Sequence, residues 1–361
     1  MRIRRISGES WIRGRLPVGC RLCRLGAKMV LFVSGLCPLR CWYCPVSRDR
    51  FRRDVTFADE LRVHSDEDVL LEARSIGARG TGVTGGDPLF VVEKTVHYIE
   101  LLKGEFGPSH HIHLYTAIPD PGALRRVADA GLDELRLHPV EYAWTRMGGK
   151  YEEFLREALD LGLTVGLEIP AIPGRGREMA RLIEFADSLG LSFVNMNELE
   201  LSDSNAEALL ARGLRTKSDV DYGIEGSEEA AREAVKLTRG LSITVHYCSA
   251  YYKGAVQMRN RLRRRARRVA RSFELPTEDG TLLFGVLVTP RVGEALRVLE
   301  EEGVPRELYE VRGMEIVLAP WVLLELWRRL PGEGYLVEAY PTEDRMVVEQ
   351  VPVEALEGEE V

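Results

Sequence analysis

The residues best suited to chemistry are the six cysteines of this 361-residue chain, because five of them fall into two tight clusters. The clusters have the spacings C-x-x-C and C-x-x-x-C-x-x-C, and the sixth cysteine stands alone. In a cytosolic chain, clustered cysteines indicate metal or redox chemistry rather than disulfides. In chain order they are Cys20, Cys23, Cys37, Cys41, Cys44 and Cys248.

The triplet Cys37, Cys41 and Cys44 offers three thiolates within eight residues, directly after the apolar segment 28–34. A structural zinc site is closed by four ligands, so three cysteines match it poorly. Three cysteines on a [4Fe–4S] cluster leave one iron without a protein ligand, and a small molecule can bind there. The triplet therefore predicts an iron–sulfur site beyond the end of a strand, where parallel α/β folds place their chemistry.

Repeated strand–helix units must position these residues. An amphipathic run, a Gly-Leu pair and a short apolar segment recur in this order four times. Each glycine is placed to end a helix in a left-handed conformation, and each apolar segment to form the next strand. The repeats are 129–139, 160–170, 188–198 and 238–248, and earlier strands are expected at 28–34, 80–85 and 111–116.

Strands that alternate with helices predict a parallel α/β sheet. Six or seven strands fit between residues 28 and 248, too few for a complete eight-stranded barrel but enough for a partial barrel or an open sheet. Beyond residue 275, a β-α-β-β-α-β order predicts a small ferredoxin-like α+β domain. The expected parts are a basic N-terminal extension with C-x-x-C, a β/α core, an Arg-rich connecting helix and an accessory domain, at 1–27, 28–250, 251–275 and 276–361.

Polar residues occupy one alternating face near the carboxyl ends of the later strands, although strands covered on both faces are usually apolar. Their convergence predicts a ligand cavity at that end of the sheet, while any single one can be a satisfied rim residue. His110, His111 and His113 show no cysteine or carboxylate partner, so we expect structural or rim histidines there. The converging residues are Arg136, His138, Glu168, Asn195, Asn197, Thr244, His246 and Cys248.

Two motifs carry a resemblance to a known family. The segment Cys37-Pro-Leu-Arg-Cys41-Trp-Tyr43-Cys44 resembles the C-x-x-x-C-x-aromatic-C signature of the radical S-adenosylmethionine (radical SAM) superfamily. Thr84-Gly85-Gly86-Asp87-Pro88 resembles that superfamily's GGEP motif, with Asp in place of Glu. The resemblance covers residues 28–250 and implies a partial (β/α)6-type TIM barrel, in an archaeal-type protein related to pyruvate formate-lyase activating enzymes. Those enzymes are usually smaller and lack a comparable C-terminal domain.

The resemblance also implies roles for individual residues. Cys37, Cys41 and Cys44 would ligate three irons of a [4Fe–4S] cluster, and S-adenosylmethionine would chelate the fourth through its amino and carboxylate groups. Tyr43 would lie beside the adenine. Backbone without a Cβ approaches a ligand closely, which suits a GGDP segment that contacts the methionyl amino group. The residues implied there are Thr84, Gly85, Gly86, Asp87 and Pro88.

Further cofactor contacts are expected along the later strands. Glu168 lies in a segment that resembles the fifth-strand region lining the cofactor in activating enzymes, and the other polar rim residues are placed by geometry as ribose, carboxylate or substrate contacts. Those four are Arg136, His138, Asn195 and Asn197. The implied reaction uses an external electron donor of the ferredoxin or flavodoxin type. Reductive cleavage of S-adenosylmethionine then gives a 5′-deoxyadenosyl radical that abstracts hydrogen from a substrate.

The remaining cysteines allow three interpretations. Cys20, Cys23 and Cys248 could ligate a second, auxiliary cluster with an open iron for substrate, as in some related enzymes. Cys248 could instead be a radical relay or hydrogen donor, or all three could be incidental and Cys248 a small buried hydrophobe. A strand of six residues spans roughly 20 Å. Cys23 would therefore lie at the opposite end of the barrel from Cys248 unless the N-terminal segment folds back.

The net charge of −7 conceals a strong asymmetry. Residues 1–53 contain 13 Lys or Arg against two acids, the last 21 residues are acidic, and eight arginines lie between Arg259 and Arg271. Such segments predict a face that meets phosphates, or alternatively an ion-paired helix face. Only four Asn and two Gln are present and Arg far outnumbers Lys, which fits a thermophile or GC-rich coding.

The basic segments favour RNA, with transfer RNA as the example considered, as the substrate of a radical enzyme. The alternatives are an activating enzyme that modifies a partner protein, a small-molecule enzyme of cofactor or lipid biosynthesis, and a non-enzymatic iron–sulfur or zinc protein. The last leaves the GGDP segment unexplained. The longest apolar stretch, 316–324, is too short to span a membrane, and no signal peptide is visible, so we expect a cytoplasmic protein.

Overall fold

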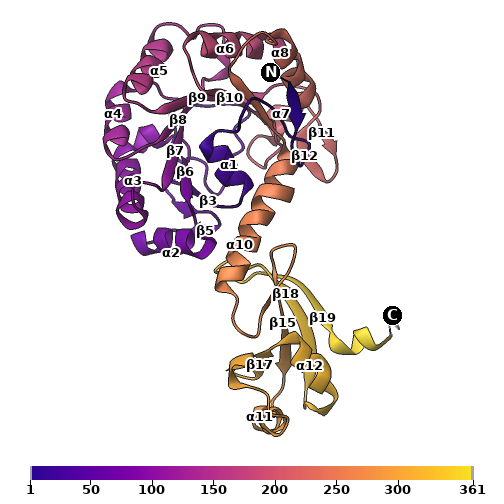
Figure 1. Ribbon diagram of the computed structural model, residues 1–361. Coiled ribbons are helices and arrows are strands. Elements are labelled where there is room, and N and C mark those ends of the chain that lie inside the picture. Colours follow the sequence, from indigo (N-terminus) through magenta and orange to yellow (C-terminus); the bar gives the residue numbers. More distant parts are fainter. Residues whose placement is uncertain (1, 359–361) are drawn as a thin grey trace. The chain divides into compact units, whose positions relative to one another are not determined.

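The main sheet of the computed structural model, which describes residues 2–358, contains seven parallel strands in chain order. Figure 1 shows them curving around a common interior, with the helices outside. This arrangement confirms the prediction of a partial β/α barrel. The strands are β3 (Lys28–Phe32), β6 (Gly80–Thr84), β7 (His111–Thr116), β8 (Glu134–Leu137), β9 (Thr164–Ala171), β10 (Phe193–Glu198) and β13 (Thr244–Cys248).

Six helices connect the parallel strands. Asp120 caps one of them by accepting a hydrogen bond from the Ala123 amide at 3.1 Å, and Pro121 occupies its first position, as its sequence predicts. The helices are α2 (Asp66–Ile76), α3 (Val92–Phe106), α4 (Pro121–Asp129), α5 (Lys150–Asp160), α6 (Gly176–Ser188) and α8 (Ser227–Leu237). Shorter elements follow strand ends: β4 (Phe57–Ala58), β5 (Leu61–Arg62), η1 (Pro88–Val91), η2 (Glu141–Ala143), α7 (Ala206–Leu210), β11 (Thr216–Ser218) and β12 (Asp221–Ile224).

Three of the four Gly-Leu junctions have the expected left-handed glycine, at Gly131, Gly162 and Gly190. The fourth differs, since Gly240 is not among the glycines with positive φ. Helix α8 ends differently, because the Thr238 amide and hydroxyl both donate to the Ala234 carbonyl. No left-handed residue is needed to satisfy that helix end.

The N-terminal segment belongs to the barrel unit rather than forming a separate extension. Strand β2 (Trp11–Arg13) pairs antiparallel with β13, with Trp11 opposite Tyr247, and β1 (Ile3–Arg5) pairs with β2. Helix α1 (Val18–Arg24) then turns into the barrel. The chain therefore folds back along its last parallel strand before the first one begins.

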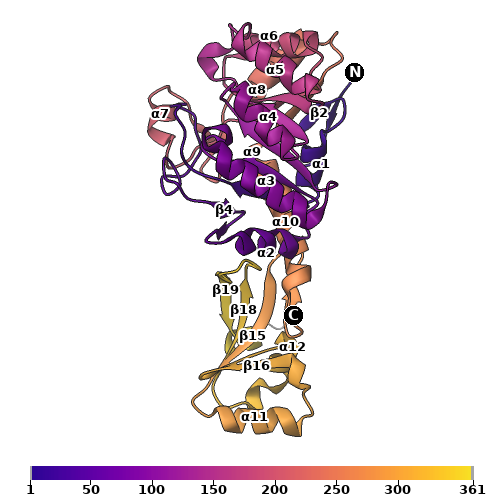
Figure 2. The ribbon, with the colours of Figure 1, turned by 90° about the vertical axis from the view of Figure 1, so that its left-hand side faces the viewer.

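Helix α1 closes the amino-terminal end of the barrel. A Cβ on Gly19 would lie 2.6 Å from His113 Nδ1 and 2.8 Å from Arg136 Nη2, so only glycine permits this approach. On another side of the helix, Leu22 packs against Gly80, the first residue of β6. Figure 2 shows α1 at one end of the barrel, with α7 at the other.

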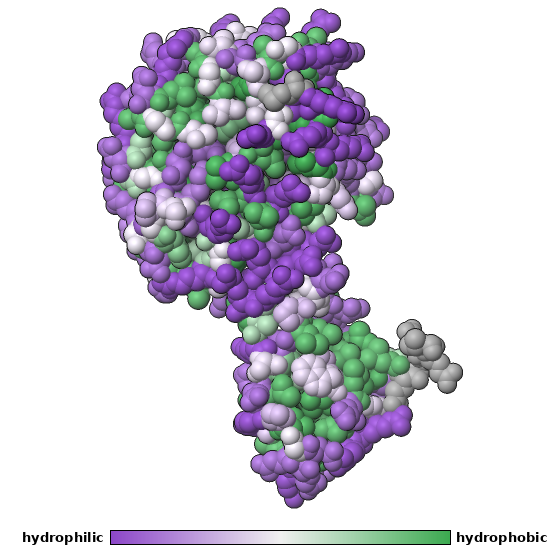
Figure 3. Space-filling view, viewed as in Figure 1, coloured by the Kyte–Doolittle hydropathy of each residue, from purple (hydrophilic) through white to green (hydrophobic). Residues whose placement is uncertain are grey.

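The chain divides into two units, Met1–Arg74 with Ala78–Met258, and Ser75–Gly77 with Arg259–Val361. The second has an antiparallel sheet in the order β16-β17-β15-β18-β19, which confirms the ferredoxin-like prediction and adds an edge strand. Its elements are α10 (Arg259–Val269), β14 (Leu275–Pro276), β15 (Leu282–Val288), α11 (Val292–Glu301), η4 (Arg306–Leu308), β16 (Tyr309–Arg312), β17 (Glu315–Leu318), α12 (Pro320–Leu326), η5 (Trp327–Arg329), β18 (Glu333–Ala339), β19 (Val347–Pro352) and η6 (Val353–Gly358). Hydrophobic residues gather on the face of this unit seen in Figure 3.

The sequence predicts one connecting helix, but the structure has three consecutive elements there. They are α9 (Ala250–Tyr252), the π-helical turn η3 (Lys253–Met258) and α10. The arginines of α10 and its surroundings make internal contacts. The buried Arg265 guanidinium donates to the Pro341 carbonyl at 2.5 Å, and Arg271 pairs with Glu310 at 3.3 Å. Part of the arginine run thus stabilises the C-terminal unit.

Within residues 2–358, no helix has the length and apolar character needed to cross a membrane.

Candidate functional site

A cavity of about 450 Å³ in the barrel unit brings together all the expected site residues except Thr244, which lies outside it beside Gly14 and Arg15. It is bounded by the segment after β3 that carries the cysteine triplet, called here the motif loop (residues 37–44), by the GGDP segment after β6, and by α1. Strands β8, β9, β10 and β13 complete the wall. The site residues that line it are Cys20, Cys23, Cys37, Cys41, Tyr43, Cys44, Thr84, Gly85, Gly86, Asp87, Pro88, Arg136, His138, Glu168, Asn195, Asn197 and Cys248.

The motif loop presents its three thiols to this cavity. All three cysteines are partly buried and free of disulfides, and the Leu39 amide donates to Cys37 Sγ at 3.4 Å. Burial raises the pKa of Cys37 to about 11 and raises the pKa values of Cys41 and Cys44 in the same direction. Thiols in this environment stay protonated until a metal displaces the proton. An amide donor to sulfur and partial exclusion of water suit an iron–sulfur cluster.

The GGDP segment packs on the residues that lead into the motif loop, Ser34 and Leu36. A Cβ on Gly85 would collide with the Ser34 carbonyl oxygen, and one on Gly86 with that of Leu36. The Gly86 amide donates to Ser34 O at 2.6 Å. The resemblance attributes the glycines to close approach of a ligand, whereas the structure shows close approach of protein backbone.

Asp87 has a different role from that of a free ligand-binding carboxylate. Its carboxylate accepts hydrogen bonds from the Leu89 amide (3.0 Å), the Thr116 hydroxyl (2.8 Å) and the Ala117 amide (2.8 Å). It thereby caps η1 and ties the carboxyl end of β6 to that of β7. A short side chain suits this position, because the three donors lie close to the Asp87 backbone, one in η1 and two at the end of β7.

Tyr43 and His138 form a chain of hydrogen bonds across the cavity wall. His138 Nδ1 lies 2.8 Å from the Glu168 carbonyl, which can only accept, so Nδ1 carries the proton. Burial lowers the pKa of His138, and the neutral ring leaves Nε2 to accept from the Tyr43 hydroxyl at 3.1 Å. Sequence reasoning missed Asn205, whose side-chain amide donates to the Tyr43 carbonyl at 3.2 Å. The only feature of the sequence that could have drawn attention to Asn205 is the small number of asparagines in the chain.

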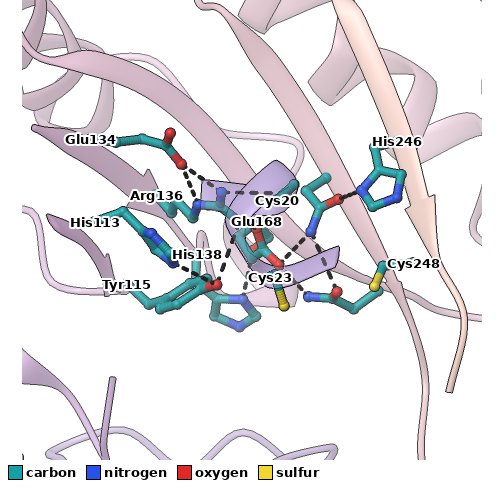
Figure 4. Close-up of polar contacts among 12 residues, drawn as sticks. Cys20, Cys23, His113, Tyr115, Glu134, Arg136, His138, Glu168, His246 and Cys248 are labelled. Atoms are coloured by element: carbon teal, nitrogen blue, oxygen red, sulfur yellow. Dashed lines mark hydrogen bonds and ion pairs between the residues drawn. The ribbon is translucent and has the colours of Figure 1, made fainter. Parts of the chain in front are cut away.

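The polar residues of β8, β9 and β10 bind one another in a buried network (Figure 4). The Glu168 carboxylate accepts from Arg136 Nη1 at 3.0 Å and from the side-chain amides of Asn195 and Asn197, both at 2.6 Å. Arg136 also pairs with Glu134 at 2.5 Å. Strand register places Glu168 beside Asn195 across β9 and β10. The network fixes the shape of the cavity wall.

The three other cysteines reach the same cavity. The objection from strand length does not apply, because the N-terminal segment folds back and α1 enters the barrel. The Cys23 thiol donates to Gln257 Oε1 at 2.8 Å, and Gln257 Nε2 lies 3.6 Å from Cys248 Sγ. Sequence reasoning missed Gln257 and also Lys28, which line the cavity beside these thiols.

The neighbouring histidines pack as structural residues. His110 is buried, lies 2.9 Å from the Thr81 hydroxyl and stacks on Phe106 at a centroid distance of 5.0 Å. His113 Nε2 lies 3.2 Å from the Tyr115 hydroxyl. Within residues 2–358, no three His, Cys, Asp or Glu side chains converge on a point that could hold a single metal ion.

His110 should make stability depend on pH. Burial lowers its pKa from 6.5 to about 4. Between these values the unfolded chain binds a proton that the folded protein does not, so stability is full above pH 6.5 and falls as the pH drops. We expect a loss of about 2 kcal/mol in the free energy of unfolding from this group between pH 7 and pH 5. Urea unfolding at both pH values should show a smaller loss for His110→Gln than for the wild type, and equal losses would contradict this assignment.

Comparisons with known proteins agree with the geometry. Residues 31–186 match a family model described as the radical SAM superfamily, and residues 280–353 match a domain of unknown function, DUF8061. A protein of Methanocaldococcus jannaschii, whose name describes a glycyl-radical enzyme activating enzyme, is 37% identical over 355 residues, covering 94% of this chain and 93% of its own.

Solved structures are more distant. Streptococcus suis SuiB bound to S-adenosylmethionine has a TM-score of 0.41 and 8% identity, over 64% of this chain and 53% of SuiB. Methylornithine synthase (PylB) has a TM-score of 0.42 and 15% identity, over 62% of this chain and 70% of its own.

Proposed function

Since this chain belongs to the radical SAM superfamily, we propose that it is an activating enzyme that abstracts a hydrogen atom from a partner protein. The enzyme is of the radical SAM type, and its cofactors are a [4Fe–4S] cluster and S-adenosylmethionine. When bound and reduced, these supply a 5′-deoxyadenosyl radical. We assign the three cluster ligands to Cys37, Cys41 and Cys44, whose thiols share one wall of the cavity.

In this proposal the other cavity residues bind and orient S-adenosylmethionine and exclude water. The backbone of Thr84–Pro88 is held against the motif loop by Gly86, so its polar groups are placed before any ligand arrives. Tyr43 is anchored at its hydroxyl by His138 and at its carbonyl by Asn205, which fixes the ring at the cavity edge. An external ferredoxin or flavodoxin would supply the electron.

The observation that carries the choice of a protein partner is a set of exposed apolar side chains beyond the carboxyl ends of the parallel strands. They lie in the segments that follow β6, β8 and β10, three of the strands whose carboxyl ends border the cavity. Exposed large apolar and aromatic side chains are typical of protein-binding surfaces. The residues and their exposed fractions are Phe90 (52%), Tyr142 (77%), Leu210 (63%), Val220 (88%) and Tyr222 (68%).

The relative from M. jannaschii supports the same choice, because its name describes an activating enzyme and the two chains match along almost their whole length. An RNA substrate has less support. Arg13, in the basic N-terminal segment, is buried and donates to the Thr238 carbonyl at 2.5 Å, and Arg265 is buried in the C-terminal unit. These arginines are engaged within the protein and are not free to bind phosphates.

The proposal predicts which class of molecule stimulates turnover. The reconstituted enzyme, given S-adenosylmethionine and dithionite, should form more 5′-deoxyadenosine when a desalted cell extract of the source organism is added. Protease treatment of the extract should remove the stimulation, whereas ribonuclease should not. Loss of stimulation after ribonuclease would favour RNA, and stimulation confined to the small-molecule fraction would favour a metabolite. Either result would contradict the proposal.

A further inference from the structure

A second set of thiols lines the cavity on the side of α1. Cys20 and Cys23 lie one turn apart on α1 and therefore share a face of that helix. Cys248 ends β13, and its side chain points to the same interior. In Figure 4 the sulfur atoms of Cys23 and Cys248 both lie beside the Glu168 network. Three thiols from two distant parts of the chain thus border one space.

These thiols contact polar groups rather than an apolar core. Cys20 Sγ accepts from Arg136 Nη2 at 3.4 Å. Cys23 and Cys248 share the side-chain amide of Gln257, at 2.8 Å and 3.6 Å. Buried cysteines that serve only as small hydrophobes pack against apolar side chains. Packing therefore does not explain why three cysteines occur here.

A buried cation beside the thiols lacks an anionic partner. Lys28 is 8% exposed, and its ammonium contacts His113 Nε2 at 3.4 Å. Among residues 2–358, the ionisable groups that act most strongly on this ammonium are Cys23, Tyr115, Arg136 and Cys20, and none of them is a carboxylate. A buried charge without a counter-charge is costly, so the site is built for an anion. A cluster held by three thiolates would supply the negative counter-charge that is missing beside Lys28.

A buried histidine nitrogen also faces this region without a partner. His246 lies two residues before Cys248 and on the same face of β13. Its Nδ1 bonds to the Asn195 side-chain oxygen, which must accept because the Asn195 amide donates to Glu168. The Nε2 lone pair has no hydrogen-bond partner among the described residues.

We propose that Cys20, Cys23 and Cys248 bind a second iron–sulfur cluster inside the barrel, with Lys28 compensating its negative charge. Each thiolate of a cluster binds a different iron, so the thiols border a shared space and need not meet at one point. The site is separate from the motif loop and does not depend on which partner the enzyme modifies. It places a second metal centre on the α1 side of the same cavity that the motif loop borders.

Iron and sulfide analysis of the anaerobically reconstituted full-length protein tests this inference. The wild type should contain about eight irons per chain, and a Cys37/Cys41/Cys44→Ala variant about four, if both clusters are of the [4Fe–4S] type. That variant should retain the electron paramagnetic resonance signal of a reduced cluster after dithionite treatment. Adding Cys20→Ala, Cys23→Ala and Cys248→Ala should remove the remaining iron.

A wild-type total near four irons would overturn the inference without requiring any variant to fold. It would leave the proposed function intact, because the motif cluster alone supplies those four. Leu22→Ala is the matched control, since Leu22 lies on α1 and packs on Gly80 but is not among the residues that line the cavity. The Leu22→Ala variant should keep the full iron content. If it also loses the second cluster, the iron loss in the cysteine variants comes from loosening of α1 and the three thiols are not shown to be ligands, which contradicts the inference.

Discussion

Replacing Cys37, Cys41 and Cys44 together with alanine should reduce 5′-deoxyadenosine formation to background. The motif loop supplies the thiols on its wall of the cavity, and the three other thiols of the cavity belong to α1 and β13 and not to this loop. Burial raises the pKa of each of the three thiols, so each thiol must release a proton when it binds iron. Chromatographic quantification of 5′-deoxyadenosine after incubation with S-adenosylmethionine and dithionite measures the effect.

The fold should survive this change. The three cysteines lie on a loop and are only partly buried, so their removal should change the melting temperature little. Ser47→Ala in the chain that follows the loop is the matched control and should retain activity, since Ser47 is not among the residues that line the cavity. Substantial 5′-deoxyadenosine from the triple variant would show that another site holds the catalytic cluster.

The part of the site that was predictable from the sequence is encoded locally. The motif loop and the GGDP segment are each contained within eight residues, and the polar rim follows from the two-residue period of strands. The glycines were recognised as close-approach positions, but their neighbours were not. Whether Gly86 faces a ligand or the Leu36 carbonyl depends on how two loops pack, and no pattern in either loop records this.

The site residues that the sequence did not predict make contacts with residues far away in the chain. Gln257 meets Cys23 across 234 positions, and Asn205 meets Tyr43 across 162. The contact between Gln257 and Cys23 exists because β2 pairs with the last parallel strand and carries α1 into the barrel, whereas Asn205 reaches Tyr43 from the segment after β10. The pairing partner of a three-residue strand is chosen by tertiary packing rather than by its own sequence. The placement of α1, and with it the convergence of the thiols, could therefore be seen only in the structure.

Arg136→Met should be among the most destabilising single substitutions in the barrel. The Arg136 guanidinium is 1% exposed and pairs with both Glu134 and Glu168. Methionine fills much of the same volume but leaves two buried carboxylates without their cation. Breaking a buried ion pair on one side costs about 3–5 kcal/mol, because the remaining charge is uncompensated. Urea unfolding followed by tryptophan fluorescence at pH 7 should show a loss of this size.

Two further variants separate this explanation from a general effect of removing arginine. Arg156→Met removes an exposed arginine that pairs with Glu152 at 2.8 Å within α5, and it should cost less than about 1 kcal/mol. Adding Glu134→Gln to Arg136→Met should recover part of the lost stability, because it removes one of the two stranded charges. If Arg136→Met costs no more than Arg156→Met, or if Glu134→Gln only adds to the loss, the network is not held together by charge. The wall of the cavity would then owe its shape to packing of the strands alone.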